Sequence, residues 1–221
     1  MRLARITAMT TDAKALKALS KADPVMARLI KSVPASLIEE EEDNPSSYRA
    51  RSHYGALLRA ITGQQLSVKA AATIHARVLD FFGGETPTPE QILAADPEEL
   101  RAAGGLSRAK TSYLRSLAEH VVSGELELEK LDDLTDETVI AELVAVKGIG
   151  IWSAQMFLMF HLNRPDVLPT GDLGIRRAAM IEYGLSELPA HDELTALAEP
   201  WRPYRTLACL YLWASVDAAP A

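Results

Sequence analysis

The chain has 221 residues, a length that allows one sizeable domain or two small lobes with a shared core. It is 48% hydrophobic and 24% charged, as in ordinary globular proteins, and no apolar run reaches the ~20 residues of a membrane-spanning helix. The formal net charge is −7, which excludes an overall coat of positive charge. Any surface that binds nucleic acid must therefore concentrate its cations locally.

The single cysteine, Cys209, excludes an intrachain disulfide framework and a four-cysteine iron–sulfur cluster. The N-terminus carries basic residues without a continuous apolar core, so it does not look like a secretory signal. The acidic run over residues 39–43 is predicted to be a solvated loop.

The N-terminal third predicts helices separated by a polar loop. Residues 1–20 are expected to form a weakly ordered extension that enters a first helix. Asp23 followed by Pro24 is typical of an N-cap with proline at the first helical position, and it predicts a helix through Val33. After the loop, apolar residues recur at helical spacing from about Tyr48.

The remaining elements are also predicted to be helical. No stretch alternates apolar and polar residues for long, so the pattern predicts an all-α fold without strands. Gly63 ends one helix, Ser67 begins the next, and Thr135 caps the helix that leads into a glycine turn. Further helices are predicted to begin at or near these residues: Pro89, Pro97, Arg108, Ile151, Leu173, Asp192 and Tyr204.

The glycine turn Gly148-Ile149-Gly150 lies between two helices, which is a helix-hairpin-helix pattern. Glycines allow close approach of another molecule, and the backbone N–H groups of such a turn face an anion together with the helix N-terminus behind it. Lys147 directly precedes the turn. The pattern predicts that residues 147–150 contact phosphate.

About two dozen residues later, a lone carboxylate, Asp172, begins another helix in the sequence Pro-Thr-Gly-Asp. Taken alone, an aspartate before a helix is usually an N-cap. The hairpin followed by this aspartate resembles the helix-hairpin-helix DNA glycosylase superfamily, and within it the monofunctional 3-methyladenine DNA glycosylase II branch in a compact form. The resemblance covers about residues 48–213.

The resemblance implies two helical lobes with a cleft between them. One lobe comprises residues 54–164 and carries a wedge turn and the hairpin. The other is discontinuous, combines residues 21–53 with 165–221 and carries Asp172.

It also implies a chemistry. Positive charge builds on the sugar as the base leaves, so Asp172 is expected to stabilise that cation and to orient or deprotonate the attacking water. The bifunctional branch has a lysine nucleophile two residues after the second glycine, where this chain has Trp152. We therefore predict base removal by water without strand cleavage.

Aromatic residues are expected to surround the extruded base. Trp152 and Trp213 are the predicted pocket walls, because alkylated purines carry positive charge and an aromatic face attracts a cation. Met156 stands where the relative with the widest substrate range has a tyrosine. The resemblance therefore does not determine the shape of the pocket or the range of bases that it accepts. Without the resemblance, a tryptophan in an apolar helix is more often part of the core.

The turn that contains Gln65 and Leu66 is predicted to supply the wedge that fills the gap left by the extruded nucleotide. Leu66 is the better apolar wedge, whereas Gln65 can hydrogen-bond the orphaned base. The alternative is that Leu66 is buried and the two glutamines cap helices. Lys69 and Arg176 are further candidates for phosphate contacts.

We expect a monomer that acts on double-stranded DNA with alkylated bases, of the 3-methyladenine and 7-methylguanine type. No cofactor, resident metal site or membrane is expected. The resemblance implies that the hairpin carbonyls can hold a monovalent cation, which the sequence neither supports nor excludes. A bacterial source would place the protein in the cytoplasm with the nucleoid, and any other source in the nucleus. Two alternatives are a non-catalytic helix-hairpin-helix DNA-binding protein and a bifunctional glycosylase/lyase for oxidised bases.

Overall fold

The computed structural model describes residues 12–34, 37–38 and 52–217. Every regular element in these ranges is helical, which confirms the predicted all-α fold. In the same ranges, no helix combines the length and apolar character needed to cross a bilayer. The acidic run at 39–43 and the expected helix start at Tyr48 lie outside the described residues.

The chain divides into two compact units. Unit 1 comprises Met1–Glu42 and Asn163–Ala221, and unit 2 comprises Asp43–Leu162. Helix α2 begins at Ala13, within residues 1–20, where the sequence predicts an extension that enters a first helix.

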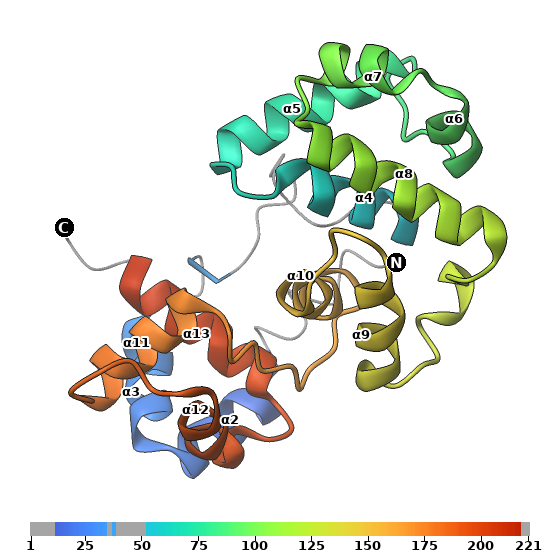
Figure 1. Ribbon diagram of the computed structural model, residues 1–221. Helices are drawn as coiled ribbons and strands as arrows, with labels where there is room; N and C mark the ends of the chain where they lie inside the picture. Colours follow the sequence, from blue (N-terminus) through green and yellow to red (C-terminus); the bar gives the residue numbers. More distant parts are fainter. Residues whose placement is uncertain (1–11, 35–36, 39–51, 218–221) are drawn as a thin grey trace. The chain divides into compact units, whose positions relative to one another are not determined.

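Unit 2 is built around α4, whose residues are mostly buried. This helix contacts α5, α8, η2 and the π-helical turn η3, while α6 and α7 pack on α8 and α5 respectively (Figure 1). The buried rings of His53 on α4 and His161 on η3 also meet, with 2.9 Å between Nδ1 and Nε2. The elements of unit 2 are α4 (His53–Gly63), α5 (Val68–Phe81), α6 (Pro89–Ala94), α7 (Pro97–Gly104), α8 (Arg108–Ser123), η2 (Leu128–Lys130), α9 (Asp136–Ala145), α10 (Ile151–Met156) and η3 (Phe157–His161).

Unit 1 joins the two ends of the described chain. The N-terminal helices, blue in Figure 1, pack among the orange and red C-terminal ones: α3 contacts α13, and α2 contacts η4. Its elements are α2 (Ala13–Ala22), α3 (Pro24–Ser32), α11 (Leu173–Tyr183), α12 (His191–Leu197), η4 (Glu199–Trp201) and α13 (Arg205–Asp217).

A buried carboxylate holds unit 1 together. Asp23 caps α3 as predicted, accepting hydrogen bonds from the amides of Val25 and Met26. Its other oxygen accepts hydrogen bonds from the hydroxyl of Tyr183 and, at 2.8 Å, from Nε1 of Trp201. Burial acts to raise the pKa of Asp23, but these hydrogen bonds outweigh it and leave the pKa below its ordinary value.

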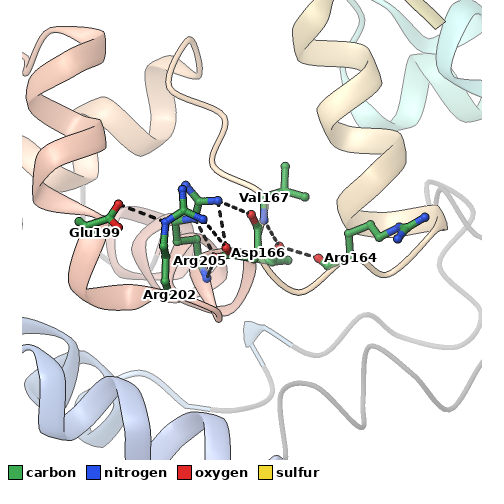
Figure 2. A network of polar contacts seen from close by, with 7 residues as sticks. Arg164, Asp166, Val167, Glu199, Arg202 and Arg205 are labelled. Carbon is green, nitrogen blue, oxygen red and sulfur yellow. Dashed lines mark hydrogen bonds and ion pairs between the residues drawn. The ribbon is translucent and has the colours of Figure 1, made fainter. Parts of the chain in front are cut away.

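The start of unit 1's C-terminal segment is fixed by an arginine-rich network (Figure 2). Asp166 accepts hydrogen bonds from Arg205 Nε at 2.7 Å and from Arg202 NH1 at 2.8 Å. Thr206 donates to the carbonyl of Arg164 and accepts from the amide of Val167. The segment that leads toward Asp172 is therefore anchored to the first turn of α13.

Candidate active site and DNA-binding surface

Asp172 caps α11. Its Oδ1 accepts a hydrogen bond from the amide of Ile175 at 2.8 Å, and its own amide donates to the carbonyl of Pro169 at 2.9 Å. The side chain is largely buried, since the residue is 9% exposed. The capping interpretation is thus confirmed, and it leaves room for a second role because a carboxylate accepts several hydrogen bonds.

Trp213, on α13, touches the same carboxylate. Its indole Nε1 donates to Asp172 Oδ1 at 3.0 Å, which brings two of the predicted site residues together. Because Oδ1 accepts both this bond and the bond from Ile175, two donors from different helices fix the carboxylate's orientation. Trp213 is partly buried, and it belongs to unit 1 like Asp172.

Gly174 allows this contact, and it was not identified from the sequence. A Cβ at position 174 would lie 3.0 Å from Cδ1 and Nε1 of Trp213 and 3.1 Å from Oδ1 of Asp172. Any side chain here would press the indole and the carboxylate apart. The signal was present in the sequence as Gly-Asp-Leu-Gly, in which the second glycine follows Asp172 by two residues.

The residues on either side of Asp172 are tied to the first residue of α12 and to the segment before it. Thr170 Oγ1 and His191 Nδ1 lie 3.0 Å apart, and Arg176 Nε donates to the carbonyl of Pro189 at 2.9 Å. Arg176, a predicted phosphate contact, therefore uses one of its N–H groups within the protein. The neighbouring Arg177 is exposed.

Cys209 lies behind this site and is completely buried. Burial first, and the negative charge of Asp172 second, raise the pKa of its thiol well above the ordinary value. A thiol that stays protonated is a poor nucleophile, so Cys209 acts as a packing residue here.

In unit 2, the hairpin turn follows the predicted pattern between α9 and α10. Gly148 has φ +92°, and a Cβ there would overlap the ring of Tyr113. Backbone conformation and the aromatic ring of α8 thus both require glycine at this position. Tyr113 was not identified from the sequence, because it is 35 residues away.

Gly150 differs from Gly148. A Cβ at Gly150 would meet no atom within 4 Å, and no side chain caps the α10 N-terminus that follows it. The protein itself thus imposes no steric need for glycine at position 150. The open space beside Gly150 and the backbone amides at the N-terminus of α10 suits the close approach of a phosphate.

The wedge turn projects into solvent. Gln65 is exposed and has a positive φ of +57°, and Leu66 is 41% exposed. The alternative in which Leu66 is buried is therefore wrong. Ser67 caps α5 by accepting a hydrogen bond from the amide of Ala70. The start of this helix therefore does not depend on Gln64 or Gln65. Lys69 is exposed on the same helix.

Gln64, which the alternative interpretation of the sequence made a helix cap, is the C-cap residue of α4, and it also ties the wedge turn to the hairpin. Its Nε2 donates to the carbonyl of Gly148 at 2.8 Å. Lys110 supports the same region, because its Nζ donates to the carbonyl of Thr62 at 2.9 Å. The wedge turn and the hairpin turn are thus held as one assembly within unit 2.

The remaining predicted pocket residues lie on α10. Trp152 is 45% exposed, whereas Met156 is 3% exposed and belongs to the core of unit 2. Met156 thus contributes to the packing beneath the helix and does not present its side chain at the surface. Ile149, between the hairpin glycines, is also buried at 5% exposure, so it anchors the turn. The described residues contain no group of three or more His, Cys, Asp or Glu arranged to hold a metal ion.

Comparison with known proteins agrees with these features. The model of the HhH-GPD superfamily of base excision DNA repair proteins matches residues 58–203. DNA-3-methyladenine glycosylase 1 of Schizosaccharomyces pombe is 37% identical over 207 residues, which cover 93% of this chain and 88% of that protein. The chain spans 65% of the length of a Bacillus subtilis relative that is 32% identical to it.

Solved structures show the same likeness. The S. pombe 3-methyladenine DNA glycosylase in complex with abasic DNA superposes with a TM-score of 0.78 at 36% identity, covering 94% of this chain and 98% of that one. A DNA-3-methyladenine glycosidase from Bacillus halodurans gives a TM-score of 0.77 at 38% identity, covering 94% and 91%. The hairpin, the helix-capping aspartate and these matches together place the chain in the HhH-GPD superfamily of base excision DNA repair proteins.

Proposed function

We propose that this protein is a monofunctional DNA glycosylase that flips alkylated purines out of duplex DNA and hydrolyses their N-glycosidic bond. The observation that carries this proposal is the carboxylate of Asp172, held by the indole of Trp213 and the amide of Ile175. The names of the relatives, which are 3-methyladenine DNA glycosylases, support the substrate class.

The chemistry follows from the charge of the transition state. As the base departs, the sugar becomes positively charged, and a fixed anion stabilises that charge without having to reorganise. The same carboxylate orients the attacking water. A methylated purine already carries positive charge and leaves readily, so no strong general acid is needed. An aromatic face such as that of Trp152 attracts such a base by about 0.5–2 kcal/mol.

Duplex DNA is the proposed partner. The open backbone at Gly150 binds phosphate, and Leu66 or Gln65 fills the gap that the extruded nucleotide leaves. The S. pombe relative was solved in complex with abasic DNA, which is the product of this chemistry, and that complex supports the proposal.

The test is release of free base from DNA treated with a methylating agent. Asp172→Asn keeps the cap and the fold but removes the negative charge, so we expect loss of excision with retained binding to abasic DNA. Asp192→Asn, which makes the same change at an exposed position of unit 1, is the matched control. Near-normal turnover by Asp172→Asn would refute the catalytic role.

Two further outcomes decide between the alternatives. Duplex binding without any base release by the wild type would favour a non-catalytic DNA-binding protein. Borohydride trapping of a covalent protein–DNA adduct would establish an amine nucleophile and a lyase step. We expect no adduct, because Trp152 occupies the position of that lysine.

A further inference from the structure

A cavity of about 420 Å³ opens in unit 2 beside the hairpin, between α7, α8 and Lys147. Four of its lining residues are cationic: Arg101, Arg108, Arg115 and Lys147. Two are anionic, Glu98 and Glu119, so the lining carries a net charge of four minus two, or +2. In a chain with a net charge of −7, this is a local concentration of positive charge of the kind that a nucleic-acid surface requires.

Two of these cations are engaged by the protein. The NH1 group of Arg115 lies 3.3–3.4 Å from three backbone carbonyls at the C-terminal end of α6, those of Ile92, Leu93 and Ala95. Arg101 pairs with Glu98, with 2.8 Å between Nε and Oε2. Both therefore shape the wall of the cavity more than they offer charge to a ligand.

The other two cations are available to an anion. Arg108 is exposed at the first position of α8, and among the described residues it makes no ion pair. Lys147 Nζ contacts a neutral acceptor, the hydroxyl of Ser112, at 3.2 Å. The backbone amide of Lys147 donates to Ser116 Oγ at 3.2 Å, which fixes the residue's position at the cavity's edge.

The cavity and the hairpin share the same supporting helix. Tyr113, which follows Ser112 on α8, packs its ring against Gly148, and Lys147 directly precedes that glycine. An extended anion held at Gly150 can thus continue along α8 toward Arg108. A DNA strand is such an anion, because it carries a phosphate at every nucleotide.

We propose that this cavity is a second phosphate subsite, in which Arg108 and Lys147 bind a backbone phosphate of the DNA whose neighbouring phosphate lies at the hairpin. This inference rests on the proposed function. It adds the place where a protein with a negative net charge concentrates cationic side chains for binding DNA. The contact is to the backbone, so it strengthens binding to every sequence alike.

The experiment measures duplex binding by fluorescence anisotropy over a range of salt concentrations, with undamaged and abasic DNA. Loss of one phosphate contact lowers the slope of log K against log salt by about 0.9. We expect Arg108→Ala to lower the magnitude of that slope by about this amount and to weaken binding to both the undamaged and the abasic DNA several-fold. Arg108→Lys should keep most of the slope, and Lys130→Ala, a surface charge outside the cavity lining, should leave it unchanged.

A wild-type slope for Arg108→Ala, in a variant with the wild-type melting temperature, would overturn the subsite. A second result would also overturn the subsite: the wild type binds inorganic phosphate at fixed ionic strength, Arg108→Ala abolishes that binding, and the salt slope for DNA stays the same. That result would identify a site for small anions. If the wild type neither binds duplex nor releases base, the proposed function itself fails. Base release by the wild type together with an unchanged Arg108→Ala slope rejects the subsite alone.

Discussion

At the scale of single residues, the proposed site depends on the carboxylate of Asp172 and on the atoms that orient it. Capping α11 uses Oδ1 of Asp172, and the same oxygen accepts from Trp213. The carboxylate is therefore positioned before substrate arrives, which is what electrostatic stabilisation of a developing cation requires. The positioning depends in turn on the missing side chain at Gly174.

Gly174→Ala should lower the excision rate by about one to two orders of magnitude, because a displaced indole no longer holds the carboxylate and small misplacements are costly. Single-turnover excision measures this. Gly171→Ala is the matched control, since its Cβ would meet its nearest neighbour at an ordinary 3.7 Å. Trp213→Phe removes the N–H donor, and combining it with Gly174→Ala should cost little more than either change alone. Fully additive losses would argue against a shared mechanism.

At the scale of elements, α8 is the support on which the hairpin and the wedge turn are assembled. Tyr113 packs on Gly148, and Lys110 holds the end of α4. Gln64 then links the end of α4 back to the hairpin. A change in any of these three side chains should alter the conformation of the hairpin and of the wedge turn.

The two hairpin glycines should separate stability from binding. Gly148→Ala meets both a positive φ and the ring of Tyr113, so it should lower the melting temperature and weaken binding to all DNA sequences. Gly150→Ala has open space around it and an ordinary φ of −94°, so it should leave the melting temperature unchanged and weaken DNA binding alone. Equal melting temperatures for the two variants would contradict this account.

The packing of α4 on α5 should depend on pH through His75. Burial first, and the charge of Arg59 second, lower the pKa of His75 to about 4. In the unfolded chain, His75 takes up a proton near pH 6.5, whereas in the folded protein it does so only near pH 4. Protonation therefore favours the unfolded state, and the free energy of unfolding falls progressively as pH falls from about 6.5 to 4. Urea unfolding at several pH values measures this. His75→Gln should flatten the dependence in that window, and an unchanged profile would exclude His75 as its source.

At the scale of the whole molecule, the chain closes unit 1 with segments from both ends of its described part. Asp23 joins them through Tyr183 and Trp201. Since Asp172 lies in this unit, the integrity of the carboxylate site depends on contacts formed by residues some 150 positions earlier in the chain.

Asp23→Ala should destabilise the protein by about 2–4 kcal/mol, because it removes a helix cap and leaves buried donors without an acceptor. The lowered pKa of Asp23 means that its stabilising effect is present above the unfolded pKa and is lost as pH falls through the folded one. The difference in unfolding free energy between wild type and variant should thus shrink in acid. A constant difference down to strongly acidic pH would contradict the assigned hydrogen bonds.

Features that depend on neighbouring residues could be predicted from the amino-acid sequence alone. Helical spacing, the caps at Asp23, Ser67 and Thr135, and the turn at Gly148 are all local signals, and the structure confirms them. These signals also sufficed for the family, because the hairpin and Asp172 lie within one short stretch.

Contacts between residues that are far apart in the chain became visible in the folded protein. Nothing near Gly174 in the sequence shows that Trp213 packs over it. Similarly, nothing near Gly148 shows that the ring of Tyr113 packs against this glycine. Likewise, the exposure of Leu66 and the burial of Met156 depend on what the rest of the chain covers. The physical reason is that side-chain contacts across helices arise from packing, in which residues far apart in the chain fill the same small volume.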